Sequence, residues 1–289
     1  MIKDSFASLG GAARTLFKSW GALLLLAALY LALLATPYTF IATGQATVWQ
    51  LAVSGVTALL TPLLFFVLQA AAAHHAHGTT AFGALLGRAL RDFWKILLIS
   101  LPFVLLGVGF VYLLGRLDGW LPQGAEAAPR SFSPGPGATP PPPLHWREAL
   151  ASTLRLLLLG LLLPLMAAHA WLSVAGRGMR ATLKSFHRVV GRAFTPRSVL
   201  VYATGLLAFG LMPFFILYTR TPVSNDWAEV SLFGLRLALV FAFTLLGWTI
   251  TLGALARTTD PAPPATEPAA EQPAPPARGP EVGAAGIQA

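Results

Sequence analysis

Three closely spaced histidines, His74, His75 and His77, are the side chains in this sequence that could ligate a metal ion. Imidazole is a ligand for Zn, Cu and Ni, and it also changes charge near neutral pH. Neighbours at such short spacing on a helix rarely converge on one ion, and no carboxylate is nearby in the sequence. We therefore interpret the cluster as the polar end of a helix and expect no bound cofactor. Metal binding or pH sensing is the alternative.

Two arginines, Arg155 and Arg236, lie inside long hydrophobic runs, at similar depth below the end predicted to face outward. Ionisable groups inside a membrane span are candidates for function. A guanidinium group binds phosphate or carboxylate through two parallel hydrogen bonds, so the pair could form a site for an anion or a lipid headgroup. The alternative is that both side chains extend to the headgroups or to nearby acidic residues. For His169, inside the fourth run, we expect a hydrogen bond to a neighbouring helix, with a functional role as the alternative.

Sequence motifs of catalytic centres are missing from the chain. It contains no GxSxG, HExxH or P-loop sequence. The 11 acidic residues lie almost entirely outside the hydrophobic runs, so we expect no paired carboxylates within the membrane. These features predict a protein that is not an enzyme. They also argue against a pump that moves protons or sodium through buried carboxylates.

The composition places these candidate residues in a membrane protein. Of the 289 residues, 55% are hydrophobic and 11% are charged, and the mean hydropathy is +0.66. A soluble domain has about 25% charged residues. The net charge is +9, but the cations flank hydrophobic runs, which indicates topology signals and anionic lipid headgroups rather than nucleic acid. The lack of cysteine excludes disulfides, thiolate metal sites and cysteine nucleophiles.

Six hydrophobic runs are each long enough to cross the hydrocarbon core as a helix, which takes about 20 residues. They define an all-α integral membrane domain over residues 1–257. Prolines inside the second and fourth runs, Pro62 and Pro164, are expected to mark kinks. The predicted spans are 20–42, 46–73, 93–114, 150–175, 198–218 and 230–256.

Two segments outside the spans are rich in proline. Residues 116–147 contain SPGPGATPPPP and are expected to form an extended linker outside the membrane. Residues 258–289 are rich in Pro, Ala, Glu and Gly, and are expected to be a disordered cytoplasmic tail. Docking of this tail on an aromatic groove of a partner is the alternative.

The distribution of cations predicts the orientation. Most of the 20 Lys and Arg residues fall on the side of the membrane that holds both chain ends. By the positive-inside rule, both termini are therefore cytoplasmic. The excess of Arg over Lys and the high Ala content favour a bacterial inner membrane. A cleaved signal peptide is the alternative for the first run, which is longer than the usual core of about 7–15 residues.

Residues 176–197, between the fourth and fifth runs, predict a basic amphipathic helix. Cations recur every fourth residue on one face. The apolar residues that recur at helical spacing on another face are Met179, Leu183, Phe186, Val190 and Phe194. Such a helix is suited to the membrane interface, with its cations toward anionic headgroups. A weaker basic segment precedes the third run. The cations expected to bind lipid headgroups are Arg88, Arg91, Lys95, Arg180, Lys184, Arg188 and Arg192.

Three similar segments precede alternate runs: LGGA at 9–12, LGRA at 86–89 and VGRA at 190–193. They predict a unit of one basic interfacial helix and one transmembrane hairpin, repeated three times in the same orientation. Chance similarity among boundary segments is the alternative. The alternation of spans with G-R-A-like basic segments resembles bacterial multi-pass families such as the membrane region found beside some glycerophosphodiester phosphodiesterases. The resemblance implies an architecture only, because no phosphodiesterase domain is present.

The sequence thus predicts a multi-pass inner-membrane protein without a catalytic motif. The function that we expect first is a lipid-interacting scaffold or an accessory, regulatory membrane protein. Its partners would be anionic membrane lipids and a membrane protein, and not nucleic acid. The alternative is a permease or a flippase-like carrier of an anionic or lipidic substrate, which would use Arg155 and Arg236.

Overall fold

The computed structural model describes residues 2–44, 47–120, 146–219 and 225–259. These residues are nearly all helical, and six helices among them are long and apolar enough to cross a membrane. The prediction of an all-α protein with six such helices is confirmed. Most of the predicted linker, residues 116–147, and nearly all of the predicted tail, residues 258–289, lie outside the described residues.

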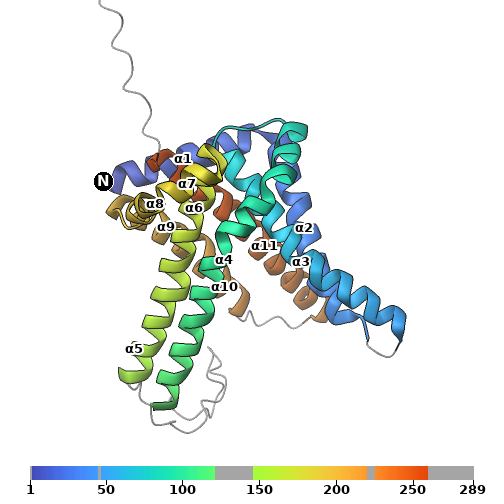
Figure 1. Cartoon of the computed structure of the whole chain (residues 1–289). Coiled ribbons are helices and arrows are strands. Elements are labelled where there is room, and N and C mark those ends of the chain that lie inside the picture. The colour runs from blue at the N-terminus through green and yellow to red at the C-terminus, as the bar shows by residue number, and fades with distance from the viewer. Residues whose placement is uncertain (1, 45–46, 121–145, 220–224, 260–289) are drawn as a thin grey trace, which may run out of the picture.

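The six candidate spans form three consecutive pairs (Figure 1). The first pair is α2 (Trp20–Ala42) and α3 (Val48–Ala76). The second pair is α4 (Phe82–Trp120) and a stretch made of α5 (Trp146–Arg155), the π-helical segment η1 (Leu156–Leu162) and α6 (Leu163–Arg177). The third pair is a stretch made of α9 (Pro196–Leu206), η2 (Leu207–Leu211) and α10 (Met212–Tyr218), followed by α11 (Asp226–Thr259).

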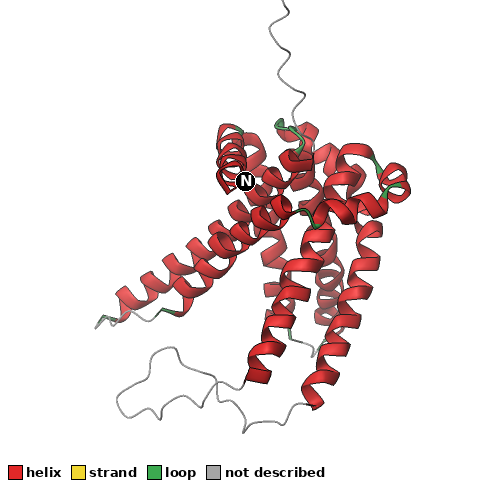
Figure 2. Cartoon of the chain, turned by 90° about the vertical axis from the view of Figure 1, so that its left-hand side faces the viewer, coloured by secondary structure: helices red, strands yellow, loops and turns green. Residues whose placement is uncertain are grey.

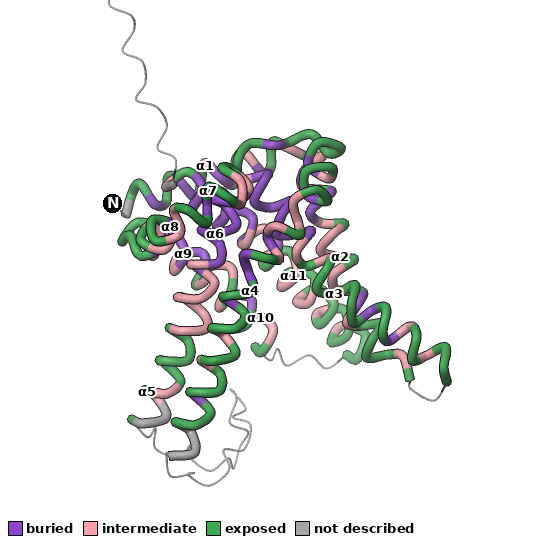
Figure 3. Tube along the Cα trace, viewed as in Figure 1, coloured by how far each residue is buried: buried purple, intermediate pink, exposed green. Residues whose placement is uncertain are grey.

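Three shorter helices gather at one end of the bundle, which we call the crowded end. They are α1 (Ile2–Lys18), α7 (Met179–Lys184) and α8 (Phe186–Ala193). Helix pairs diverge from there toward the opposite, splayed end (Figure 2). Buried residues are concentrated at the crowded end (Figure 3). Because only 6% to 22% of the most hydropathic stretch of each span is buried, most of this apolar surface is available to face lipid.

The N-terminal helix α1 packs on the last turns of α11. Ala12 and Leu16 are buried on the packed face of α1. Arg257 of α11 donates from Nη2 to the carbonyl oxygen of Gly11 at 2.9 Å and to Oγ1 of Thr15 at 2.7 Å. The first and last helices of the described chain are therefore joined by both apolar packing and hydrogen bonds.

The basic stretch over residues 176–197, which the sequence predicts as one helix, is divided in the structure. Gly178 has a φ of +82° and ends α6, and the helices α7 and α8 are separated at Ser185. Leu183 is 52% exposed and Phe194 is 46% exposed. Two apolar side chains of the predicted apolar face thus remain outside the protein core.

The second basic segment, residues 86–95, is not a separate helix. It is the first part of α4, which begins at Phe82 and continues into the span without a break. Ala89 is fully buried there, whereas Arg88 and Arg91 on the same segment are exposed. No glycine turn or proline interrupts this segment, so the helix continues through it.

Prolines lie just after both π-helical segments. The segment η1 ends two residues before Pro164, and η2 ends two residues before Pro213, whereas Pro62 lies within the continuous helix α3. Proline has no N–H group, so the carbonyl four residues earlier, that of Gly160, loses its α-helical donor. The Tyr202 hydroxyl of α9 donates to this carbonyl at 3.1 Å. A neighbouring helix thus supplies a donor to the carbonyl whose α-helical donor Pro164 removes.

Replacing Tyr202 by Phe is expected to lower the free energy of unfolding by about 0.5–1.5 kcal/mol, because the Gly160 carbonyl loses its donor. In a Pro164→Ala background, residue 164 regains an N–H that can serve the same carbonyl, so the loss should be smaller. Both effects are measured by unfolding the wild-type protein, the two single variants and the double variant in bicelles. An equal loss in the two backgrounds would show that Tyr202 does not compensate for Pro164.

Candidate functional site

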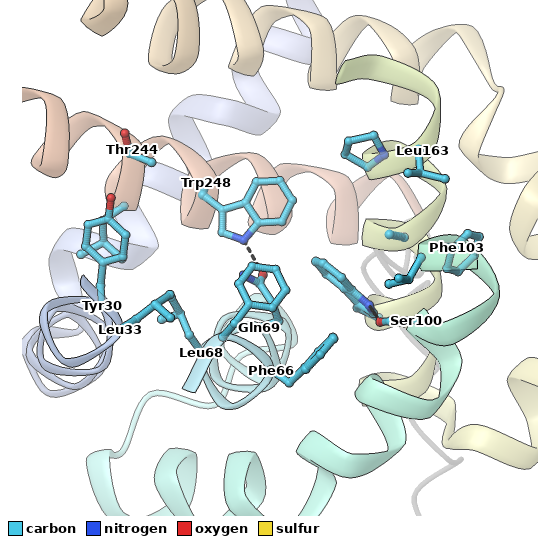
Figure 4. Close-up of a pocket in the computed structure, with 16 residues that line it drawn as sticks. Tyr30, Leu33, Phe66, Leu68, Gln69, Ser100, Phe103, Leu163, Thr244 and Trp248 are labelled. Carbon is cyan, nitrogen blue, oxygen red and sulfur yellow. Dashed lines mark hydrogen bonds between the residues drawn. The ribbon is translucent and has the colours of Figure 1, made fainter. Parts of the chain in front are cut away.

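An apolar cavity of about 460 Å³ lies between α2, α3, α4, α6 and α11 (Figure 4). Its lining includes Leu33, Phe66, Phe103, Leu163 and Leu245. The lining residues lie inside the candidate spans and away from the span ends, so the cavity is inside the apolar part of the bundle. Such a cavity is suited to a hydrocarbon group.

Two hydrogen-bonded pairs of side chains lie at the wall of this cavity. Trp248 Nε1 donates to Gln69 Oε1 at 2.6 Å, and Trp171 Nε1 donates to Ser100 Oγ at 2.7 Å. The two indole rings also meet edge to face, with ring centroids 6.1 Å apart. These contacts connect α3, α4, α6 and α11 around the cavity. Because both indole N–H groups are satisfied within the wall, they do not require a polar ligand.

The rim of the cavity is accessible from outside the bundle. Phe65 of α3 and Val104 of α4 both line it, and they are 37% and 52% exposed. None of its described lining residues is a Lys, Arg, His, Asp or Glu. The arrangement can therefore hold an apolar molecule by packing, and it lacks the side chains that most often transfer protons.

The two arginines predicted to bind an anion are on helices with different neighbours. Arg155 is exposed at the end of α5, which packs mainly on α4 and η1. Arg236 is half-buried in α11, which packs on α1, α3, α9, α10 and η2. Neither side chain lines the apolar cavity. A shared anion site at Arg155 and Arg236 stays a prediction.

The three clustered histidines contact three different groups. His74 Nε2 lies 3.1 Å from Asp92 Oδ2, and His75 Nδ1 lies 3.3 Å from a main-chain carbonyl of the turn after α3. His77 Nε2 donates to the carbonyl of Leu172 in α6 at 2.8 Å. The rings therefore do not converge, and the described residues include no group of three or more His, Cys, Asp or Glu that could hold a metal ion.

The seven cations predicted to bind lipid headgroups belong to the first part of α4 and to α7 and α8. Arg88, Arg91, Arg180, Lys184 and Arg188 are exposed, and Lys95 and Arg192 are half-buried. Binding of headgroups by these cations stays a prediction.

His169, by contrast, is 3% exposed in α6, and its Nε2 has no hydrogen-bond partner in the described part of the chain. The hydrogen bond that we expected from His169 to a neighbouring helix is not seen at this nitrogen.

Sequence reasoning missed the residues that form the cavity wall. Gln69, Trp171 and Trp248 lie within hydrophobic runs. A glutamine and two tryptophans inside apolar segments were the available signal, because their polar groups need partners there. Comparison of the chain with protein-family models, curated proteins and solved structures gave no match. The described residues thus define the class: nearly all-helical, with six apolar helices of span length and an apolar cavity between them.

Proposed function

We propose that the protein is a lipid-interacting membrane protein whose apolar cavity holds a hydrocarbon chain of a membrane lipid. The cavity of about 460 Å³ between five helices is the observation that supports this function. An empty cavity of this size would forfeit dispersion contacts along its whole lining. Because hydrocarbon chains of the bilayer surround the helices, a lipid chain is the molecule available to supply those contacts.

The proposed role is non-catalytic: a scaffold or an accessory, regulatory protein of a bacterial inner membrane. In this proposal the crowded end faces the cytoplasm together with both termini. The exposed cations and the exposed side chains of Leu183 and Phe194 support an interfacial position for α7 and α8. We also propose that α1, the first part of α4, and α7 with α8 are the interfacial parts of three repeated units.

Native mass spectrometry of the protein released gently from bilayers tests this function. Ala167 lines the cavity and is 7% exposed, so an Ala167→Phe variant fills the space of the chain. We expect the wild-type protein to retain a stoichiometric lipid, and Ala167→Phe to lose it. The matched control is Ala242→Phe at an exposed position of α11, which should retain the lipid. Equal retention by all three proteins would refute an occupied cavity.

A carrier that moves the bound lipid is the second candidate function. The exposed rim at Phe65 and Val104 favours it, because a chain could enter and leave sideways. If the protein is a carrier, Ala167→Phe should stop the movement of lipid between leaflets in proteoliposomes. If it is a scaffold, Ala167→Phe need not change that movement. If the substrate is anionic, Arg155→Gln and Arg236→Gln should also reduce its uptake.

A further inference from the structure

A separate polar pocket of about 340 Å³ lies at the crowded end, between the turn that joins α3 to α4 and the last turns of α6. It shares no lining residue with the apolar cavity. Its lining includes Arg88, Arg177, His74, His77 and Thr79. No carboxylate is among its described lining residues, and pockets of about 300–1,000 Å³ are of the size that holds small ligands.

A tight turn and a close approach between helices shape the wall of this pocket. Gly78 has a φ of +91°, which lets the chain reverse direction directly after α3. His77 Nε2 donates to the carbonyl of Leu172 in α6 at 2.8 Å. A Cβ at Gly176 would come within 2.9 Å of the His77 ring. Glycine at both positions thus allows the α3–α4 turn to close against α6.

Arg88 is oriented toward the pocket by a hydroxyl group. Its Nη1 donates to Thr79 Oγ1 at 2.7 Å, and Thr79 itself is 9% exposed. A guanidinium carries five N–H donors, so this bond leaves donors for a further acceptor. The Thr79 oxygen accepts from Arg88, and its own proton can be donated to a ligand in the pocket.

Asp92, one turn after Arg88 on α4, has partners other than Arg88. Asp92 accepts hydrogen bonds from His74 Nε2 at 3.1 Å and from Lys95 Nζ. The negative charge of Asp92 is therefore engaged by His74 and Lys95. Arg88 and Arg177 remain as the charged groups that line the pocket.

We propose that this polar pocket binds a phosphate-type oxyanion, with Arg88 and Thr79 as direct donors and Arg177 contributing charge. Arginine matches the planar geometry of two phosphate oxygens and is always protonated. The oxyanion is the phosphate of a lipid headgroup or a phosphate group in solution. The proposal goes beyond the acyl-chain site and does not depend on it, because the two cavities have separate linings.

The full-length protein in a maltoside detergent, which carries no phosphate group, titrated with inorganic phosphate, gives the direct test. Calorimetry should report saturable binding that Arg88→Gln weakens by at least about tenfold, the effect expected when a charge-assisted hydrogen bond is lost. Arg91→Gln is the matched control, since Arg91 is exposed on the same helix and does not line the pocket. An equal loss in both variants, or phosphate binding unchanged by Arg88→Gln, would overturn the proposal.

A second arm separates the two sources of the phosphate group. In nanodiscs that contain phosphatidylglycerol, a headgroup ligand should occupy the pocket and abolish the response to inorganic phosphate. A ligand from solution should still bind saturably in these nanodiscs, and Arg88→Gln should weaken that binding. No phosphate binding in maltoside, together with phosphatidylglycerol retention that Arg88→Gln leaves unchanged, would exclude both sources.

The rival role of Arg88 and Arg177 is to offset the negative C-terminal ends of α3 and α6. That role predicts that Arg88→Gln lowers stability without changing phosphate affinity. If Arg88→Gln fails to fold, Thr79→Val removes the proposed second donor while keeping the side-chain shape and the Arg88 charge. Thr79→Val should then weaken phosphate binding severalfold, and unchanged binding would contradict the site.

Discussion

A Gly247→Ala variant is expected to be strongly destabilised, because Gly247 is the point at which α11 approaches the segment η2 most tightly. A Cβ built on Gly247 would overlap Cβ and Cγ of Phe209. These atoms are next to the main chain, so rotation of the Phe209 ring cannot relieve the overlap. The third helix pair would have to separate, at a cost of about 1–3 kcal/mol or more in the free energy of unfolding.

Gly234 on the same helix provides the matched control for Gly247. No atom lies within 4 Å of a Cβ built there, so Gly234→Ala adds no clash. Alanine favours a helix over glycine by about 1 kcal/mol, so Gly234→Ala should leave stability unchanged or raise it. Thermal unfolding in detergent compares the two variants. Similar melting temperatures for both would contradict the close packing of α11 on η2.

A Gly11→Ala variant is expected to release α1 from the crowded end. A Cβ at Gly11 would occupy the position of Arg257 Nη1, so the guanidinium would have to move. Its hydrogen bonds to the Gly11 carbonyl and to Thr15 Oγ1 would then be lost. Because these bonds lie at an exposed position, their loss should cost about 0.5–1 kcal/mol, and it should appear as faster amide exchange in residues 2–18.

The neighbouring Gly10 separates this effect from helix propensity. No atom lies within 4 Å of a Cβ built at Gly10, so Gly10→Ala should slow amide exchange in α1 or leave it unchanged. An Arg257→Gln variant should reproduce the effect of Gly11→Ala. Exchange that is equally slow in all of these variants would show that Arg257 does not hold α1 in place.

Hydropathy alone predicted the six apolar helices, because a chain that crosses hydrocarbon must satisfy its main chain within each segment. The subdivisions near the crowded end were harder to predict. The break between α6 and α7 depends on Gly178, which adopts a positive φ, whereas Gly87 lies within the unbroken helix α4. Glycine is compatible with both outcomes, so tertiary packing decides which one occurs.

The contacts that form the candidate sites could not be predicted from sequence spacing. Gln69 and Trp248 are 179 residues apart, and Ser100 and Trp171 are 71 residues apart. Asp92, the partner of His74, is 18 residues beyond it, across the turn between α3 and α4. To predict any of these pairs, one must know which helices are neighbours. The residue types in a single sequence do not show that.

The apolar cavity and the polar pocket fit different parts of one amphiphile, but the two proposed binding sites can be tested separately. The apolar cavity includes Trp171, and the polar pocket begins at Leu172, the next residue of α6. Filling the apolar cavity with Ala167→Phe should leave phosphate binding intact. Removing Arg88 should leave retention of the acyl chain intact when the lipid has no phosphate group.

Quenching of cavity tryptophans by lipids with brominated acyl chains tests the central claim most directly. Of the eight tryptophans, a variant would keep Trp171 and Trp248, which line the cavity, and carry Phe at the other six positions. Trp171 is only 7% exposed, so bulk lipid cannot reach most of its surface. An occupied cavity predicts strong quenching that Ala167→Phe removes. The positive control is a variant that keeps only Trp94, which is 47% exposed and lies inside the candidate span Phe82–Leu117. Weak quenching unaffected by Ala167→Phe, with strong quenching of this control, would contradict the account.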